Sequence, residues 1–141
     1  MFRQFFHSLE QLPDGQRLSL ETVIEHLAYD ASGLIPVITQ DAKSKDVLMF
    51  AWMNRQSLEL TLSTKRMTYW SRSRQQLWKK GETSGHVQQL VSMAFDCDGD
   101  AIVCLVEQSG AACHTGRNDC FYLKVDLENN TVVIEGEACL P

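Results

Sequence analysis

The spacing of apolar residues along the chain is mainly that of β-strands. Apolar and polar residues alternate over 87–95, which is typical of a half-buried strand, whereas 101–106 is a continuous apolar run, as expected for a strand covered on both faces. A polar segment at 40–46 separates two apolar runs, which predicts a hairpin. In all, the pattern predicts seven strands, at 34–39, 47–52, 67–72, 87–95, 101–106, 121–127 and 132–134. A loop up to Gly85 follows the third of these strands.

Helical spacing is found in three shorter segments. Residues 1–28 form a helical N-terminal extension, in which Pro13 ends a first helix and Ser19 can cap a second. Asn54 can cap a third helix, which should end near Lys65. Together, the elements predict a mainly β fold with α+β character. We expect a single compact domain with a mixed or antiparallel sheet or a barrel-like core, and with two or three helices.

Composition narrows the classes of protein to which the chain can belong. With 44% hydrophobic and 22% charged residues, positions 1–141 fit one soluble globular domain. No run of about 18 apolar residues exists, so no membrane span is expected. The N-terminus lacks the apolar region and cleavage site of a secretory signal. The five cysteines, an odd count, therefore indicate a cytoplasmic protein whose thiols are reduced and available for metal ligation or catalysis.

The net charge of −5 argues against general affinity for nucleic acid, but residues 65–80 contain six cations and no acid. A solvated basic face and an anion site both explain this segment, and the hydroxyls and glycines around it favour the anion site. No G-x-x-x-x-G-K-[ST] or G-x-G-x-x-G motif is present, so we expect a phosphorylated small molecule rather than ATP or a dinucleotide. The candidate substrate-binding residues are Trp70, which could stack on a base, and Ser71, Arg72, Ser73, Arg74, Lys79, Lys80, Thr83, Ser84 and Gly85.

Three carboxylates occupy alternate positions at the end of the fourth predicted strand. On an extended backbone, Asp96, Asp98 and Asp100 project to one side and Cys97 projects to the other. Neighbouring carboxylates repel each other, and a hard cation such as Mg²⁺ relieves that repulsion. An EF-hand loop also begins with alternating acids, but Ala101 stands where that loop needs glycine. An acidic surface turn is the other alternative.

Three of the five cysteines lie in polar, loop-like surroundings and are the candidate zinc ligands: Cys97, Cys113 and Cys120. Three protein ligands leave a fourth position open, which is the catalytic arrangement, although unligated thiols also fit this spacing. Cys104 lies in an apolar strand as a small buried hydrophobe, and Cys139 has no diagnostic context. The zinc partners of Cys97 come from a distant loop or a second chain, so a homodimer with a shared site is one hypothesis. His114 is the candidate proton acceptor, with a surface or supporting histidine as the alternative.

These motifs together resemble the phosphoribosyl-AMP cyclohydrolase family of histidine biosynthesis. The resemblance runs from about Asp30 to Tyr122, with one departure at Trp52, where the family often has tyrosine. It rests on seven motifs: Gly33-Leu34-Ile35-Pro36, Ala51-Trp52-Met53-Asn54, Tyr69-Trp70-Ser71-Arg72-Ser73-Arg74, Thr83-Ser84-Gly85, Asp96-Cys97-Asp98-Gly99-Asp100, Cys113-His114-Thr115-Gly116 and Cys120-Phe121-Tyr122.

The resemblance implies an intertwined homodimer with one Zn²⁺ and one Mg²⁺ per subunit and a zinc site shared between the chains. Magnesium would be held by Asp96, Asp98 and Asp100, and zinc by Cys97, Cys113 and Cys120. The substrate's two phosphates would face Arg72, Arg74, Lys79 and Lys80. Because the chain stops at Pro141, without room for the pyrophosphohydrolase domain that often follows in this family, a monofunctional enzyme is expected.

The implied reaction is hydrolytic opening of the adenine ring of N1-(5-phosphoribosyl)-AMP between N1 and C6. It yields the phosphoribosyl-formimino-AICAR phosphate intermediate, as the third step of L-histidine biosynthesis. Ribosylation at N1 makes C6 electrophilic, zinc-activated water can attack it, and His114 or an aspartate would move the protons. Two other hypotheses stay open from the residues alone: a non-catalytic zinc-binding interaction module, and a zinc hydrolase acting on another nucleotide.

Overall fold

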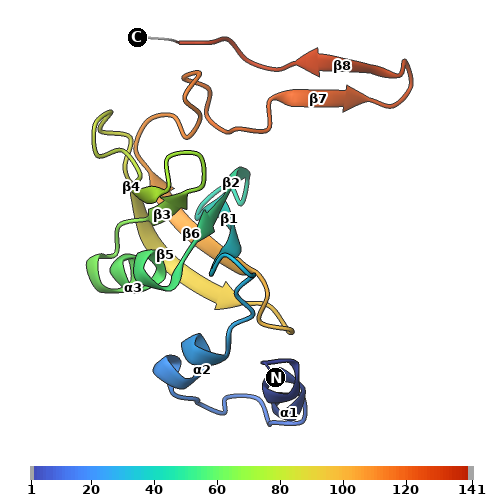
Figure 1. Ribbon diagram of the computed structural model, residues 1–141. Coiled ribbons are helices and arrows are strands. Elements are labelled where there is room, and N and C mark those ends of the chain that lie inside the picture. Colours follow the sequence, from blue (N-terminus) through green and yellow to red (C-terminus); the bar gives the residue numbers. More distant parts are fainter. Residues whose placement is uncertain (1, 140–141) are drawn as a thin grey trace.

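The computed structural model describes residues 2–139, and a four-stranded mixed sheet forms the centre of this part of the chain. Strand β1 (Ile35–Asp41) runs antiparallel to β2 (Val47–Met53) and parallel to β6 (Ile102–Gln108), and β5 (Gln88–Phe95) runs antiparallel to β6 (Figure 1). The mixed sheet and the hairpin at 40–46 are confirmed. The described strands do not close on themselves, so the barrel-like alternative is wrong. Across the sheet the order is β2, β1, β6 and β5.

The central strand β6 has one buried face and one half-buried face. Cys104 is fully buried, as expected for a small hydrophobe in this strand, whereas Val103 on the other face is half-buried. Ile38 pairs with both Val103 and Phe50, so these three side chains share that second face, and Ile38 and Phe50 are exposed. The expected cover on both faces of this strand is therefore incomplete within a single chain.

Helix α3 (Arg55–Thr64) begins and ends where the sequence predicts. The Asn54 side-chain oxygen accepts from the Ser57 amide at 2.8 Å, and the Asn54 amide donates to the Ser57 hydroxyl at 2.9 Å. This reciprocal pair satisfies two amides that the first turn of a helix leaves without partners. At the other end, Lys65 adopts a left-handed conformation with φ of 64°, which ends the helix.

A second, two-stranded sheet follows α3 and packs against both α3 and β2. It consists of β3 (Thr68–Ser71) and β4 (Gln76–Lys79), which pair in antiparallel register. The first strand agrees with the prediction. The second differs from it, because the sequence predicts a loop at 76–79: four residues with two adjacent apolar side chains are too short for a periodic signal. Their pairing with β3 makes them a strand.

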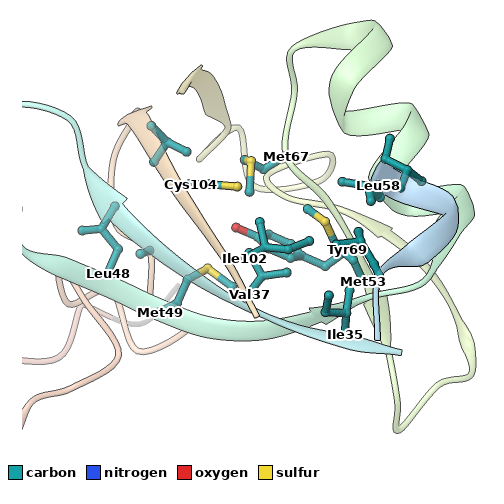
Figure 2. Packing of buried hydrophobic residues seen from close by; sticks show 14 of the residues in the cluster. Ile35, Val37, Leu48, Met49, Met53, Leu58, Met67, Tyr69, Ile102 and Cys104 are labelled. Carbon is teal, nitrogen blue, oxygen red and sulfur yellow. The ribbon is translucent and has the colours of Figure 1, made fainter. Parts of the chain in front are cut away.

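The core lies between the two sheets and α3, and the buried Tyr69 is at its centre (Figure 2). The Tyr69 hydroxyl lies 2.8 Å from the Thr39 hydroxyl and donates to the Gln88 side-chain oxygen at 2.6 Å. These hydrogen bonds satisfy polar groups that would otherwise be buried without partners. Because they join β1, β3 and β5, they fix the two sheets relative to one another.

The N-terminal extension is helical, as predicted, and lies at the end of the large sheet where β5 turns into β6 (Figure 1). It consists of α1 (Phe2–Leu9) and α2 (Leu20–His26). The Ser19 hydroxyl accepts from the Thr22 amide at 3.3 Å and caps α2. Phe6 and Ile24 are buried, so both helices contribute to the core. Within the described residues, no helix combines the length and the apolar character needed to cross a bilayer.

The C-terminal hairpin stands apart from the rest of the molecule (Figure 1). It is built from β7 (Leu123–Asp126) and β8 (Thr131–Ile134), which pair only with each other. An isolated two-stranded hairpin is marginally stable in water, and a large exposed apolar patch marks an interaction surface. The exposed apolar side chains on and beside this hairpin are Leu123, Val125, Leu127, Val132, Val133 and Ile134.

Candidate metal and substrate site

The loop that follows β6, at 109–122 and named the thiol loop, brings two of the three candidate zinc ligands together. Cys113 and Cys120 lie with their thiols within hydrogen-bond reach of each other. The loop is folded by its own backbone, since the Gly116 amide donates to the Cys113 carbonyl at 3.0 Å. It is tied to the large sheet because the Cys120 amide donates to the Leu48 carbonyl at 2.7 Å. Two adjacent thiols on an anchored loop form two soft ligands of the kind that zinc prefers.

The two thiols differ in acidity. Burial opposes ionisation of Cys113, but the Thr115 hydroxyl, which donates to its sulfur at 3.0 Å, and the Thr115 amide outweigh burial and lower the pKa of Cys113. Cys120 is exposed as a residue, but partial burial of its thiol, followed by the adjacent Cys113, raises its pKa to about 11. One thiol of the pair is therefore prepared to ionise, and the second would ionise readily only beside a cation.

Lys80 brings a positive charge to this thiol pair. Its Nζ atom donates to the Ala112 carbonyl at 2.7 Å and lies 5.5 Å from the centre of the Trp78 ring. Burial lowers the pKa of Lys80, while Cys120 and Cys113 act in the opposite direction. The side chain is only 8% exposed, so Lys80 differs from the other cations of its segment, which lie in solvent.

The aspartate segment is a turn and not the extended backbone that the sequence interpretation assumed. The Asp100 amide donates to the Asp96 side-chain oxygen at 2.9 Å, and the Gly99 amide donates to the Asp96 carbonyl at 3.0 Å. The reversal is needed because β5 and β6 pair directly on either side of it, and Gly99 permits it with φ of 67°. Alternating carboxylates after a strand predict that the strand continues, because the sequence alone does not show that β5 turns back to pair with β6.

This turn still brings carboxyl groups together. Asp96 and Asp100 share a side-chain hydrogen bond, which raises the pKa of Asp100, with smaller contributions from burial and from the charges of Asp96 and Asp98. Burial of Asp96 acts against ionisation, but the hydrogen bonds from Asp100 and from nearby backbone amides lower its pKa. Ionised carboxylates this close in the chain repel each other and a cation relieves that repulsion, so this turn fits a hard, oxygen-preferring ion.

Cys97 lies far from the other two candidate zinc ligands. It belongs to the turn at the start of β6, whereas Cys113 and Cys120 follow the end of that strand (Figure 1). The seven residues of β6 span about 20 Å, so one chain cannot place all three thiols around one ion. In agreement, no group of three His, Cys, Asp or Glu side chains within 2–139 is arranged to hold a metal ion. Cys97 is exposed.

The basic segment at 65–80 contains the β3–β4 hairpin, and the loop at 80–85 follows it. The Arg72 guanidinium lies 4.7 Å from the centre of the Trp52 ring, and the Arg74 amide donates to the Ser71 hydroxyl at 3.3 Å. The loop at 80–85 is closed by a 2.8 Å bond from the Gly85 amide to the Gly81 carbonyl. In solvent lie Arg72, Ser73, Arg74, Lys79, Thr83, Ser84, Gly85 and, on the thiol loop, His114, whereas Trp70 and Ser71 are half-buried.

Known proteins match this chain over most of its length. The phosphoribosyl-AMP cyclohydrolase family model matches residues 49–122, which include the basic segment, the aspartate turn and the thiol loop. The phosphoribosyl-AMP cyclohydrolase of Alcanivorax borkumensis is 51% identical over 90% of this chain and 89% of its own length. That of Hydrogenovibrio crunogenus is 53% identical over 85% and 82%. The chain belongs to the phosphoribosyl-AMP cyclohydrolase family. The resemblance noted in the sequence is thereby confirmed, and with it membership of a family of hydrolases in histidine biosynthesis.

Two features of this cyclohydrolase-family site could not be predicted from its motifs. Lys80 is predicted as a substrate-binding cation, but its bond to the Ala112 carbonyl depends on a contact between segments 32 residues apart. The Trp52 indole N–H is buried and has no acceptor among the described residues. The sequence carries only a weak signal for each feature. Lys80 lies near an aromatic residue, and Trp52 stands where the family often has tyrosine.

Proposed function

We propose that the protein hydrolyses the adenine ring of N1-(5-phosphoribosyl)-AMP. The oxygen of water adds to C6, the C6–N1 bond breaks, and N1 accepts a proton. The product carries a carboxamide in place of the opened ring and a phosphoribosyl-formimino group on the neighbouring nitrogen. The family membership of the chain is the observation that carries this proposal, and the two groups of candidate ligands support it.

The active protein is a homodimer in which Cys97 of one chain meets Cys113 and Cys120 of the other. The distance of about 20 Å along β6 supports this, because it separates the thiols within one chain. The exposed C-terminal hairpin and the half-covered second face of the large sheet, with Ile38 and Phe50, supply apolar surface for an intertwined partner. The partner is a second copy of this chain, since the missing third ligand is one that this chain exposes.

Zinc is the ion that suits the three thiols, and its Lewis acidity would lower the pKa of a water molecule bound in the remaining position. Three thiolates carry more negative charge than a divalent ion offsets, and the Lys80 ammonium next to the pair compensates for part of it. His114 follows Cys113 in the thiol loop and is exposed, so it can accept the proton that water loses. It can then donate that proton to N1 as the C6–N1 bond breaks.

The aspartate turn would hold Mg²⁺. Asp96 and Asp100 already face each other, and Asp98 contributes a third carboxylate from the same turn. A dication bound between them would relieve the repulsion between these carboxylates. In the dimer this turn lies beside the zinc site, because Cys97 belongs to the turn.

The hairpin β3–β4 and the loop at 80–85 would bind the substrate. Arg72 and Arg74 offer planar guanidinium groups to the phosphates, with Ser71, Ser73 and Lys79 beside them. Thr83, Ser84 and the Gly85 amide offer hydroxyl and backbone donors, and Trp70 offers an aromatic face. Because Lys80 contacts the thiol loop, this binding surface leads directly to the zinc ligands.

Ring opening of purified N1-(5-phosphoribosyl)-AMP, followed by ultraviolet absorbance, tests the function. With Zn²⁺ and Mg²⁺ present the spectrum should change, and a chelator should abolish the change. A folded, zinc-loaded dimer that leaves the spectrum unaltered would overturn the proposal.

A further inference from the structure

The N-terminal extension contacts the aspartate turn at one backbone position. Phe6 of α1 is 6% exposed, and its ring lies directly against Gly99. A Cβ atom added to Gly99 would overlap that ring. The carbonyl of the same residue, Gly99, accepts a 2.7 Å hydrogen bond from the amide of Ala28, which follows α2. Gly99 is thus held by α1 on its Cα side and by the end of α2 at its carbonyl.

Phe6 is itself held in place by its neighbours. Phe5 meets it edge to face at 5.1 Å and stacks on the His26 ring at 3.9 Å, with an interplanar angle of 8°. His26 lies with Nδ1 2.8 Å from the Thr22 carbonyl, which fixes the imidazole on α2. The position of the Phe6 ring therefore depends on the packing of α1 against α2.

The turn has few other supports. Its remaining hydrogen bonds are local: Asp96 accepts from the Gly99 and Asp100 amides, and its own amide donates to the Ala101 carbonyl. Asp98 and Asp100 are exposed, and like charges this close in the chain repel each other. A cation site gains affinity when its ligands are held in the binding geometry beforehand, because the bound ion then does not have to order them.

We propose that Phe6 is a positioning residue for the metal-binding carboxylates, acting through Gly99 from a segment outside the matched family region of 49–122. The inference rests on the proposed function of the aspartate turn as a divalent-cation site. Docking of the extension and cation binding are then coupled: each favours the other by the same factor.

Mn²⁺ titration of the zinc-loaded protein, with the unbound ion measured by electron paramagnetic resonance, tests the coupling. Phe6→Ala should weaken Mn²⁺ binding about tenfold, which is the size of coupling expected from the direct contact between Phe6 and Gly99. The zinc content should not change. Phe6→Leu, which keeps an apolar side chain there, should recover most of the affinity. Gln4→Ala, an exposed position on α1, is the matched control and should bind Mn²⁺ as the wild type does.

A second variant locates the ion. Asp98→Asn should weaken Mn²⁺ binding. If it does not, the ion does not bind at the turn, and both the proposed magnesium site and this inference are wrong. If Asp98→Asn weakens binding but Phe6→Ala leaves it unchanged while lowering the melting temperature, Phe6 has a purely structural role and only this inference is overturned.

Hydrogen exchange on the wild-type protein gives a test that needs no variant. Coupling predicts that Mn²⁺ slows exchange of the Ala28 amide and of the α1 amides, whereas amides of the distant β7–β8 hairpin keep their rates. Equal rates at Ala28 with and without bound Mn²⁺ would contradict the proposal even if Phe6→Ala fails to fold.

Discussion

The Nζ atom of Lys80 donates a 2.7 Å hydrogen bond to the carbonyl oxygen of Ala112, the residue that precedes Cys113. This bond joins the end of β4 to the thiol loop. It places a buried cation beside Cys113 and Cys120, the two candidate zinc ligands on this loop. The basic segment and two zinc-ligand candidates are therefore parts of one site.

Lys80→Met should weaken zinc binding, because it removes the cation that favours ionised Cys113 and Cys120 and leaves the Ala112 carbonyl without its partner. The loss of a buried, charged hydrogen bond should also lower the free energy of unfolding by about 1–3 kcal/mol. Zinc affinity can be measured by competition with a chromophoric chelator. Lys79→Met, an exposed neighbour, is the control and should leave zinc affinity unchanged. Equal affinities for both variants would rule out the electrostatic role of Lys80.

Tyr69→Phe should destabilise the protein by about 1–3 kcal/mol, because it leaves the buried Thr39 and Gln88 side chains without the hydroxyl between them. Urea denaturation measures this loss. Tyr29→Phe is the control, since its half-buried hydroxyl makes a single 3.2 Å bond to the Ile24 carbonyl and should matter less.

The same variant has a pH signature. Burial raises the pKa of Tyr69 above its ordinary value of 10. Above that value the unfolded chain loses the phenol proton and the folded protein keeps it, so stability falls as pH rises. Stability measured from pH 9 to 11 should therefore decline less steeply in Tyr69→Phe than in the wild type. Identical slopes of stability against pH would show that ionisation of this phenol does not contribute to the loss of stability at high pH.

Gly81→Ala and Gly85→Ala form a matched pair in the substrate loop. Both glycines have positive φ, of 79° and 81°, so either substitution strains the backbone by about 1 kcal/mol or more. At Gly81 the new Cβ would also overlap the His86 backbone, whereas nothing lies within 4 Å of it at Gly85. Thermal denaturation should therefore show a clearly larger loss for Gly81→Ala. A comparable loss for the two would mean that the 80–85 loop moves aside without penalty.

Arg72→Ala should raise KM for N1-(5-phosphoribosyl)-AMP about tenfold or more, because a guanidinium that binds phosphate makes charge-assisted hydrogen bonds. Its packing on Trp52 is an exposed contact, so the melting temperature should change little. Steady-state kinetics measures the effect. Arg66→Ala, at an exposed position outside the β3–β4 hairpin, should keep the wild-type KM. If both variants have the same KM, Arg72 does not contact the substrate.

The local features of this fold are those that the sequence predicts best. The Asn54–Ser57 cap and the hairpin at 40–46 are formed by residues close together in the chain, so their signals are complete in a short window. At Gly99 the sequence predicts a strand instead of the turn, because the alternation of Asp96, Asp98 and Asp100 is compatible with either structure.

Features that depend on long-range pairing could not be predicted. Lys80 is buried because the thiol loop returns to it from 32 residues further along the chain. The candidate ligands themselves were identified from residue type, since thiols and carboxylates have few structural reasons to gather. Their distribution over the two ends of β6 follows from the strand order, which motif spacing does not contain.

The shared zinc site is the central claim, and mixing two inactive variants tests it most directly. Cys97→Ser and Cys120→Ser should each be inactive alone, because each removes one ligand from every site. In a heterodimer of the two, one site combines the intact Cys97 of one chain with the intact Cys113 and Cys120 of the other. Random pairing should therefore restore about one quarter of wild-type activity. With heterodimers verified by native mass spectrometry, a mixture as inactive as its components would contradict a site built from both chains.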